Sequence, residues 1–456
     1  MVTQADVQPS IRVETRAFLR LSIPLASAQV AQAAVGFVDT IMMGHLGTES
    51  LAAGGLASTT FQLLLNVASG FVMAVSPLVA EAYGAGRKGQ VEQIARQGLW
   101  LSLLLSLPLM IGLAHLEPAL VRLGQPAPIA TLAAPYFEFI LWGIFPALGF
   151  AMLRGYASAL SQAQIVTAVV MIGTLFNIAG NYVLGFGKFG FPRMGLAGLG
   201  LASGLSFWLM FLIFLVYCLK HPQLKEYRFL QDLKQFNFKI LRRLGAIGVA
   251  IAVTIALEYG LFAVVTFLMG ILGTEVLAAH QTVYQTMYII FMVPLGMSYA
   301  VTARVGQWYG QEDLRGARRA GYVGIALAGS FMLVTALVLV VCRQQVIGIY
   351  IDIENPQNAR VLALALPMLF VSALAQLLDG VQRVAMGALY GLQDTRVPML
   401  LSGAAFWGVG LTTGYLLGFL LGLEGVGLWI GQSIGVAVAG LIFVWRFHRL
   451  TAAKHI

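Results

Sequence analysis

Long apolar runs follow one another along almost the whole chain, and they constrain its fold more than any other feature. A helix needs about 20 apolar residues to cross the hydrocarbon core of a bilayer. Gly, Pro and charged residues divide the runs into twelve candidate spans, near 17–43, 51–80, 97–116, 128–153, 165–187, 195–219, 244–270, 277–303, 321–342, 358–389, 396–420 and 425–445. The runs are too long and too uniformly apolar for the strands of a transmembrane β-barrel. The sequence therefore predicts an all-α polytopic membrane protein with twelve transmembrane helices.

Composition excludes several other classes of protein. Of the 456 residues, 59% are apolar and 10% are charged, whereas soluble domains average roughly 45–50% and 25%. The sequence contains no Walker-type glycine loop, no nucleophile elbow and no Cys/His cluster with metal-ligand spacing. We therefore expect no enzymatic activity, no ATP hydrolysis and no cofactor. Cys218 and Cys342 lie near helix ends on opposite membrane faces, so we expect free thiols.

The net charge of +9 is best explained as an orientation signal. With the N-terminus inside, 23 of the 28 Lys and Arg residues fall in cytoplasmic segments, which agrees with the positive-inside rule. Because the positive charge is explained by membrane orientation, we expect no nucleic-acid partner. The first apolar stretch continues past residue 35, so it is expected to be a membrane helix rather than a cleaved signal peptide. We expect a plasma (inner) membrane protein with both termini in the cytoplasm.

An internal repeat divides the chain into two halves. VDTIMMGHLGTESLAA at 38–53 and VVTFLMGILGTEVLAA at 264–279 agree at 11 of 16 positions. Because each half has an even number of spans, the two copies cross the bilayer in the same direction, related by a pseudo-two-fold axis along the membrane normal. The expected organisation is a six-helix bundle over 1–219, a flexible, basic cytoplasmic linker over 220–243, and a second six-helix bundle over 244–456.

Four acidic residues interrupt the apolar spans: Asp39, Glu138, Glu258 and Asp379. A charge at the centre of a span costs at least roughly 2.5–3.5 kcal/mol, which favours a functional role and a position facing a cavity. Glu258, about midway along the seventh span, is the strongest candidate. Such an acid can exchange a proton or supply oxygen ligands to Na⁺, and either use couples an ion gradient to transport.

Each of the other acids has a simpler alternative. Asp379 lies one helical turn before Arg383, so these two residues can form a structural ion pair. Asp39 is near the outer end of its span, from which its carboxylate can extend to the interface. For Glu138, near the outer third of its span, the structural interpretation is favoured.

Polar and aromatic residues in the first, seventh and eighth spans are candidates for lining a substrate cavity. For the polar residues the alternative interpretation is hydrogen bonding between helices, which is the more common role of such residues in membranes. The aromatic residues and the methionine suit a cationic, lipophilic substrate. The candidates are Gln29, Gln32, Tyr259, His280, Gln281, Tyr284, Gln285, Tyr288, Phe291 and Met292. Pro24 lies within the first span and predicts a kink or bending point there.

Four segments carry a resemblance to a known family. They are FVDTIMMGHLGTESLAA, SPLVAEAYGAGR, GQWYGQ and GALYGLQDTRVPM, arranged in two repeated halves. Together they resemble the multidrug and toxic compound extrusion (MATE) family, and within it the NorM-like subgroup. The resemblance implies an antiporter that exports cationic, lipophilic compounds in exchange for Na⁺ or H⁺.

The resemblance also implies roles for individual residues. Family members of the NorM-like type use acids in the first, seventh and tenth spans, which match Asp39, Glu258 and Asp379, with the cation bound at the latter two. This chain departs from the family at Phe291, where some relatives have Tyr, and at Arg383, which adds a positive charge beside Asp379.

We therefore expect a monomeric, ion-coupled efflux antiporter for small cationic compounds that works by alternating access in the lipid bilayer. A flippase for an amphipathic or lipid-linked precursor is the alternative, but it requires a cationic cavity. An intramembrane enzyme or a channel would need a catalytic pair or a pore ring, and neither is found.

Overall fold

Helices and turns make up the part of the chain that the computed structural model describes, residues 10–452, and these residues form no strand. Within this part, twelve helical stretches are long and apolar enough to cross a membrane, as the sequence predicts. Five of the predicted spans are built from two or more consecutive helical segments, which the hydropathy pattern did not indicate.

The first six stretches belong to the N-terminal half of the sequence. They are α1 (Ile11–Leu46), α2 with α3 (Thr48–Val72, Val75–Gly84), α4 (Lys88–Ala114), α6 with η1 and α7 (Ala127–Ile140, Leu141–Gly143, Ile144–Ala159), α8 with the π-helical segment η2 (Gln164–Gly180, Asn181–Gly185), and α9 (Leu196–Lys220). The short helix α5 (Leu116–Arg122) lies between α4 and α6.

The second six stretches repeat this pattern. They are α10 (Phe238–Leu272), α11 (Thr274–Gly310), α12 (Leu314–Val341), η3 with α14 (Pro356–Asn358, Ala359–Gly391), α15 through η5 (Arg396–Ser402, Gly403–Leu411, Thr412–Tyr415, Leu416–Leu420), and α17 (Glu424–Ala452). The short helix α13 (Arg343–Gly348) follows α12. The fifth span of each half contains π-helical turns, η2 in one and η4 and η5 in the other. Since π-helical turns are rare and frequently occur at functional sites, polar residues in these two spans are candidates for a functional role.

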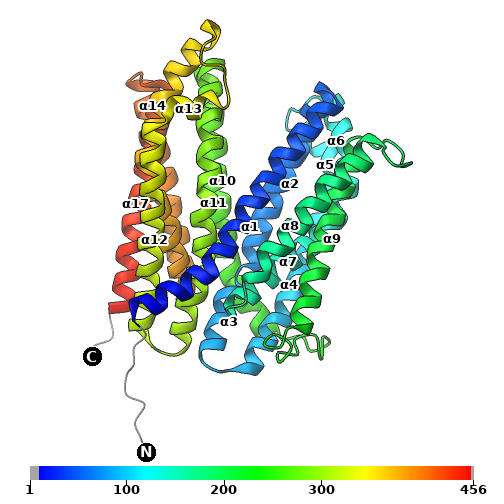
Figure 1. Cartoon of the computed structure of the whole chain (residues 1–456), viewed down its shortest axis with the longest axis vertical. Coiled ribbons are helices and arrows are strands. Elements are labelled where there is room, and N and C mark those ends of the chain that lie inside the picture. Colours follow the sequence, from blue (N-terminus) through cyan, green and yellow to red (C-terminus); the bar gives the residue numbers. More distant parts are fainter. Residues whose placement is uncertain (1–9, 453–456) are drawn as a thin grey trace, which may run out of the picture. The chain divides into compact units, whose positions relative to one another are not determined.

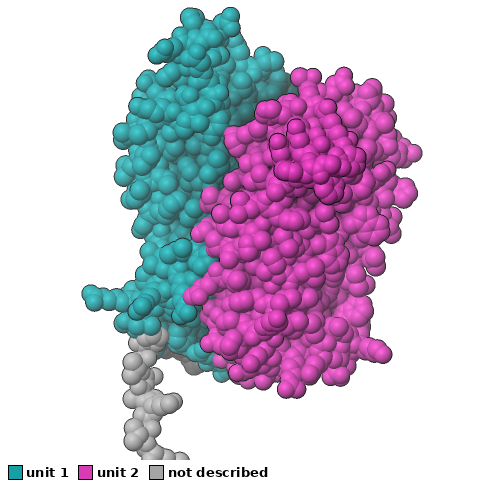
Figure 2. Space-filling model, turned by 45° about the vertical axis from the view of Figure 1, so that its right-hand side comes forward, with its two compact units in different colours: residues 1–26, 253–456 teal, residues 27–252 magenta. Residues whose placement is uncertain are grey.

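The helices form two compact units, unit 1 with residues 1–26 and 253–456 and unit 2 with residues 27–252 (Figure 2). In unit 1, α14 packs against α11, α12 and α17, which run side by side (Figure 1). In unit 2, α9 packs against α6, α7 and α8. Glycines permit the closest helix contacts: a Cβ atom at Gly387 of α14 would lie 2.6 Å from the carbonyl oxygen of Ser298 on α11, so this crossing requires a residue without a side chain.

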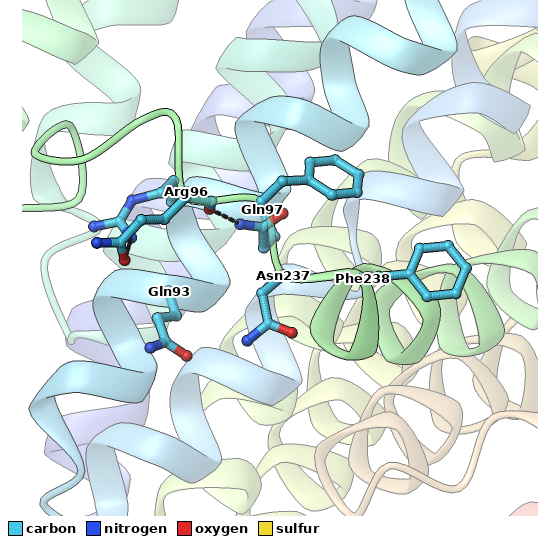
Figure 3. A pocket seen from close by; sticks show the side chains of 7 residues that line it. Gln93, Arg96, Gln97, Asn237 and Phe238 are labelled. Atoms are coloured by element: carbon cyan, nitrogen blue, oxygen red, sulfur yellow. Dashed lines mark hydrogen bonds between the residues drawn. The ribbon is translucent and has the colours of Figure 1, made fainter.

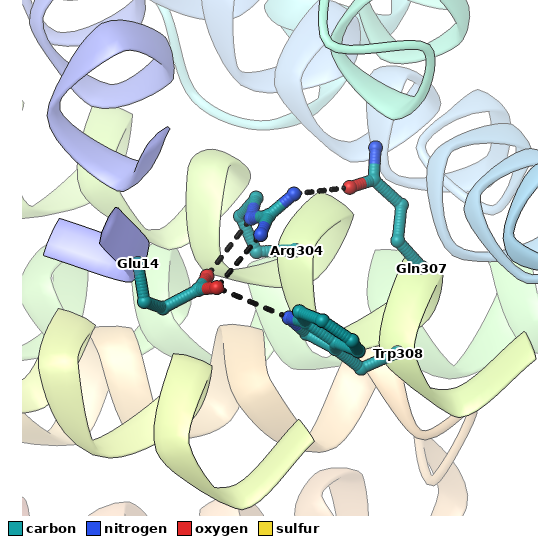
Figure 4. A network of polar contacts seen from close by, with 4 residues as sticks. All are labelled: Glu14, Arg304, Gln307 and Trp308. Atoms are coloured by element: carbon teal, nitrogen blue, oxygen red, sulfur yellow. Dashed lines mark hydrogen bonds and ion pairs between the residues drawn. The ribbon is translucent and has the colours of Figure 1, made fainter. Parts of the chain in front are cut away.

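The unit boundaries differ from those expected at 219/220 and 243/244 because the start of the first helix of each half belongs to the unit formed by the other half. Residues 11–26 of α1 belong to the unit of the C-terminal helices. Glu14, which is 1% exposed, accepts hydrogen bonds from Arg304 Nε (2.9 Å) and Nη2 (2.7 Å) and from Trp308 Nε1 (3.2 Å) (Figure 4). Gly296 of α11 lies directly against the backbone of Leu25 and Ala26. Pro24 therefore lies just before the point where α1 passes from one unit to the other.

The start of α10 makes the reciprocal contact in unit 2. Arg243 Nη2 lies 3.1 Å from Glu81 Oε2 of α3. Gly248 lies against the backbone of Phe71, where a Cβ atom would be 2.5 Å from the carbonyl oxygen. This exchange of helix starts depends on contacts between residues far apart in the sequence, so no hydropathy pattern could indicate it.

The segment 221–237 is not the flexible linker that the sequence predicts. Leu224 and Phe229 are fully buried, and side chains of α4 donate hydrogen bonds to backbone carbonyls of the segment: Arg96 Nε to Phe229 O (3.4 Å), Gln97 Nε2 to Gln235 O (2.9 Å) and Trp100 Nε1 to Leu233 O (2.9 Å). The segment, α4 and the first residue of α10 line an open pocket of ≈ 270 Å³ (Figure 3). The polar composition of the segment predicted a flexible linker. However, an irregular backbone needs hydrogen-bond partners for its carbonyl groups, and side chains of α4 supply them.

We expect replacement of Arg96 by Met to loosen this segment. The change removes the donor to Phe229 O and a second bond, from Nη1 to Gln235 Oε1 at 3.4 Å, and a hydrogen bond is worth about 1 kcal/mol. Local opening should become more frequent, so trypsin should cleave at Lys225, Arg228 or Lys234 roughly fivefold faster. Gln93→Ala, at a residue that lines the same pocket, is the matched control and should leave the rate unchanged.

Candidate functional site

In unit 1, a buried ion pair joins two helices. Arg383 of α14 places Nη2 at 2.7 and 2.6 Å from the two carboxylate oxygens of Glu258 on α10. Their side chains are 9% and 11% exposed, and the ring of Phe291 on α11 lies with its centroid 4.9 Å from the guanidinium carbon. The sequence offered an Asp379–Arg383 pair as the alternative to a functional Asp379; the ion pair that Arg383 forms is with Glu258.

Asp379 completes a cluster of three charged groups in unit 1. It is half-buried on α14, one turn before Arg383, and it interacts electrostatically with both Glu258 and Arg383. The cluster thus contains two carboxylates and one guanidinium. Among the residues that the structure describes, no three His, Cys, Asp or Glu side chains gather as a metal cluster. A cation bound here would have two carboxylates as its charged ligands.

An aromatic ladder runs along α11 beside this cluster. His280, Tyr284 and Tyr288 occupy successive turns of one helix face, with ring centroids 5.9 and 6.2 Å apart. Phe291, one turn beyond Tyr288 on α11, contacts the guanidinium of Arg383, so the ladder ends next to the charged cluster. Tyr259, the residue after Glu258, interacts electrostatically with Tyr288 and with Glu258. The structure therefore brings together the aromatic residues that the sequence singled out.

Sequence reasoning missed three residues of this region. Phe262 of α10 contacts Tyr284 with centroids 5.5 Å apart, and Trp429 of α17 contacts His280 at 5.6 Å. Thr266 Oγ1 lies 3.0 Å from His280 Nε2, and His280 is fully buried. The signal available was that Phe262 and Thr266 follow Glu258 at spacings of four and eight residues, on the same face of the helix.

The remaining candidates on α11 lie elsewhere. Gln281 and Gln285 occupy an exposed face of the helix, away from the buried His280 side chain. Met292 is buried, 5% exposed, next to Phe291. The structure thus separates the two glutamines from the aromatic ladder that the sequence grouped with them.

In unit 2, Asp39 lies at one end of a polar chain. Asn181 Nδ2 donates to Asp39 Oδ1 (2.6 Å) and to Asn177 Oδ1 (3.1 Å), and Asn177 Nδ2 donates to Ser203 Oγ (3.0 Å). Asn181 is the first residue of the π-helical segment η2, and it is fully buried. Its Oδ1 atom has no hydrogen-bond partner among the described residues. An unpaired buried acceptor beside a carboxylate is a suitable environment for a bound proton or cation.

Tyr136 of α6 extends this polar chain. It is 3% exposed, interacts electrostatically with Asp39 and hydrogen-bonds with Ser203. None of Asn177, Asn181, Ser203 or Tyr136 was singled out from the sequence, although two asparagines one turn apart in an apolar span are a usable signal. Asp39 is therefore held inside a hydrogen-bonded network.

The other polar candidates of unit 2 have structural partners or lie apart. Gln29 Oε1 accepts a hydrogen bond from Arg154 Nη1 (2.7 Å) between α1 and α7, which is the interhelical role weighed against cavity lining. Gln32 is half-buried one turn later, and Glu138 is exposed on α6. Glu138 therefore does not share the buried surroundings of Asp39.

Comparisons with known proteins agree with this architecture. The MatE family model matches residues 24–183 and again residues 250–416, one match in each half of the repeat. A probable multidrug resistance protein NorM from Synechococcus sp. is 58% identical over 442 residues, covering 97% of this chain and 95% of the relative. The Multidrug resistance protein NorM of Burkholderia vietnamiensis is 35% identical and covers 98% and 97%.

Solved structures share the fold at low sequence identity. A mutant of a Vibrio cholerae MATE transporter superposes with a TM-score of 0.88 at 18% identity, covering 98% of this chain and 99% of that one. A MOP superfamily transporter from Pyrococcus furiosus, described as having a binding pocket of reverse polarity, gives 0.86 at 19% identity, with 98% and 99% covered. The duplicated family match and the full-length identity to NorM proteins show that this chain belongs to the multidrug and toxic compound extrusion (MATE) family, within its NorM-like subgroup.

Proposed function

We propose that this chain is a monomeric antiporter of the inner membrane that exports cationic, lipophilic compounds, driven by an inward gradient of Na⁺ or H⁺ and not by ATP. Its relatives are named multidrug resistance proteins, which supports efflux of small organic compounds. The proposal goes further than those names in specifying the charge of the substrate and the source of energy.

The observation that carries the proposal is the placement of carboxylates beside aromatic rings in a membrane interior. In unit 1, the Glu258–Arg383 pair contacts Phe291, one turn beyond the ladder from His280 to Tyr288, and Asp379 lies one turn before Arg383 on α14. Carboxylates attract a cation, and aromatic faces stabilise it further when it is organic and weakly hydrated. Na⁺ or H⁺ can use the same carboxylates. One negative site that accepts either the ion or the substrate is sufficient to couple their movements.

Alternating access follows from this competition if the two facing states differ in affinity. A ligand shifts a conformational equilibrium only by its different affinity for the two states. The positive-inside count supports a cytoplasmic location for both termini. In unit 2, Asp39 and the unpaired Oδ1 of Asn181 are our candidates for a second proton or cation site.

A flippase for an amphipathic or lipid-linked precursor is the alternative function. Anionic head groups would require excess positive charge in the interior of the protein. Here the charged cluster of unit 1 has two carboxylates against one guanidinium. The excess of negative charge favours cation export.

Ethidium uptake by everted membrane vesicles that contain the protein tests the proposal. One vesicle set receives a Na⁺ gradient alone, and the other receives a pH gradient alone. We expect one gradient to drive accumulation of ethidium, and Glu138→Gln, at an exposed acid outside both clusters, to behave as the unchanged protein. Accumulation that persists after both gradients are collapsed, or that requires ATP, would contradict ion coupling.

A further inference from the structure

The charged cluster of unit 1 contains its own cation. Arg383 fills the position that an incoming cation would take at Glu258, because its Nη2 atom contacts both carboxylate oxygens at 2.7 and 2.6 Å. The pair is nearly closed to solvent, with side chains 9% and 11% exposed. In this arrangement the guanidinium occupies the side of Glu258 from which both carboxylate oxygens can be reached together, so a cation that binds there must displace it.

Asp379 provides a second position for the guanidinium. Asp379 and Arg383 lie four residues apart on α14, and a helical side chain points back toward the preceding turn. An acid followed by Arg at this spacing forms a favourable pair on a helix. Asp379 is one helical turn from Arg383, so it is the nearest carboxylate on the same helix to which a change of side-chain conformation would bring the guanidinium.

Two further features suit Arg383 to such an exchange. Its Nε atom is buried and has no hydrogen-bond partner among the described residues, so the guanidinium does not use all of its donors at Glu258. The Phe291 ring, 4.9 Å from the guanidinium carbon, attracts the cation through its face without fixing it in one hydrogen-bond geometry. The pair with Glu258 therefore leaves part of the hydrogen-bonding capacity of the Arg383 guanidinium unused.

We propose that Arg383 is a tethered competitor, which occupies Glu258 until an incoming cation displaces it toward Asp379. With both acids ionised the cluster has one excess negative charge, so it accepts one monovalent cation before it is neutral. The assignment of that cation as coupling ion or exported compound rests on the proposed function. The competition itself does not, because it is a property of cation binding by the purified protein.

Competition of this kind lowers the apparent affinity of the site. The apparent dissociation constant equals the intrinsic one divided by the fraction of protein in which the site is free. If Arg383 leaves Glu258 free in less than about a tenth of the molecules, removing the guanidinium should tighten cation binding by at least about tenfold.

The test measures cation binding to purified wild type, Arg383→Gln, Arg383→Lys and the double variant Glu258→Gln/Arg383→Gln. The probes are ²²Na⁺ in a scintillation proximity assay and ethidium in a fluorescence polarisation assay. We expect Arg383→Gln to bind at least one of them about tenfold or more tightly than wild type, and Arg383→Lys to fall between the two. The double variant should lose the gain, because Glu258 is then no longer a carboxylate.

Two results would overturn the proposal. One is unchanged affinity for both probes in Arg383→Gln, or in Arg383→Lys should the Gln variant not yield folded protein. The other is a gain that survives in the double variant, since this would reflect the general loss of positive charge and not the release of Glu258. Failure of the proposed function is a separate observation, read from gradient-driven ethidium accumulation by wild type.

Discussion

Replacing Glu258 with Ala should abolish gradient-driven export and should also lower the stability of the protein. The change removes the carboxylate that pairs with Arg383 at 2.7 and 2.6 Å, and breaking a buried ion pair from one side costs about 3–5 kcal/mol. The cost should lie at the lower end of this range, because Asp379 is close enough to interact with the remaining guanidinium. Ethidium accumulation in everted vesicles and the thermal unfolding midpoint of the purified protein measure the two effects.

Two further variants separate charge from stability. Glu258→Gln keeps the size and an acceptor oxygen, so it should unfold closer to wild type while still failing to export. The double variant Glu258→Ala/Arg383→Met removes both charges, so it should recover stability relative to Glu258→Ala without recovering export. Full export by Glu258→Gln would show that the carboxylate is not the coupling site.

The sequence was sufficient to predict the helices because the bilayer imposes a simple rule on each span separately. A run of about 20 apolar residues has few alternatives to a membrane helix, and all twelve spans are found in the described residues. The packing of the start of α10 could not be predicted in this way, because its contacts with Glu81 and Phe71 join residues more than a hundred positions apart in the sequence. Hydropathy is a local property, so it could not assign residues 238–252 to unit 2.

The candidate site shows the same limit at the level of single residues. The cost of a buried charge made Glu258 and Asp379 candidates from the sequence alone. The partner of Arg383 was not identifiable, because the spacing rule for helices compares only residues on one helix and therefore offered Asp379. The pair with Glu258 depends on how α10 and α14 approach each other. Asn181 was missed for a related reason, since its role as a partner of Asp39 appears only when η2 and α1 are placed together.

Replacing Asp39 with Asn should reduce export to the level of vesicles without the protein while leaving its fold unchanged. The amide oxygen of Asn can still accept the hydrogen bond that Asn181 Nδ2 donates at 2.6 Å. The free energy of unfolding should fall by only about 1 kcal/mol, the difference between a charged and a neutral hydrogen bond. The lost charge, however, removes the candidate proton or cation site beside the unpaired Oδ1 of Asn181.

Asp39→Ala is the control that distinguishes the effect of losing the hydrogen bond from the effect of losing the charge. It leaves one N–H of Asn181 without its partner, although the bond to Asn177 Oδ1 remains, and should cost about 1–3 kcal/mol. Both variants should fail to accumulate ethidium, but only the Ala variant should show a clearly lower unfolding midpoint. If Asp39 instead only extends to the membrane interface, Asp39→Asn should export as wild type does, because a carboxylate in contact with interfacial water can be replaced by an amide without consequence for transport.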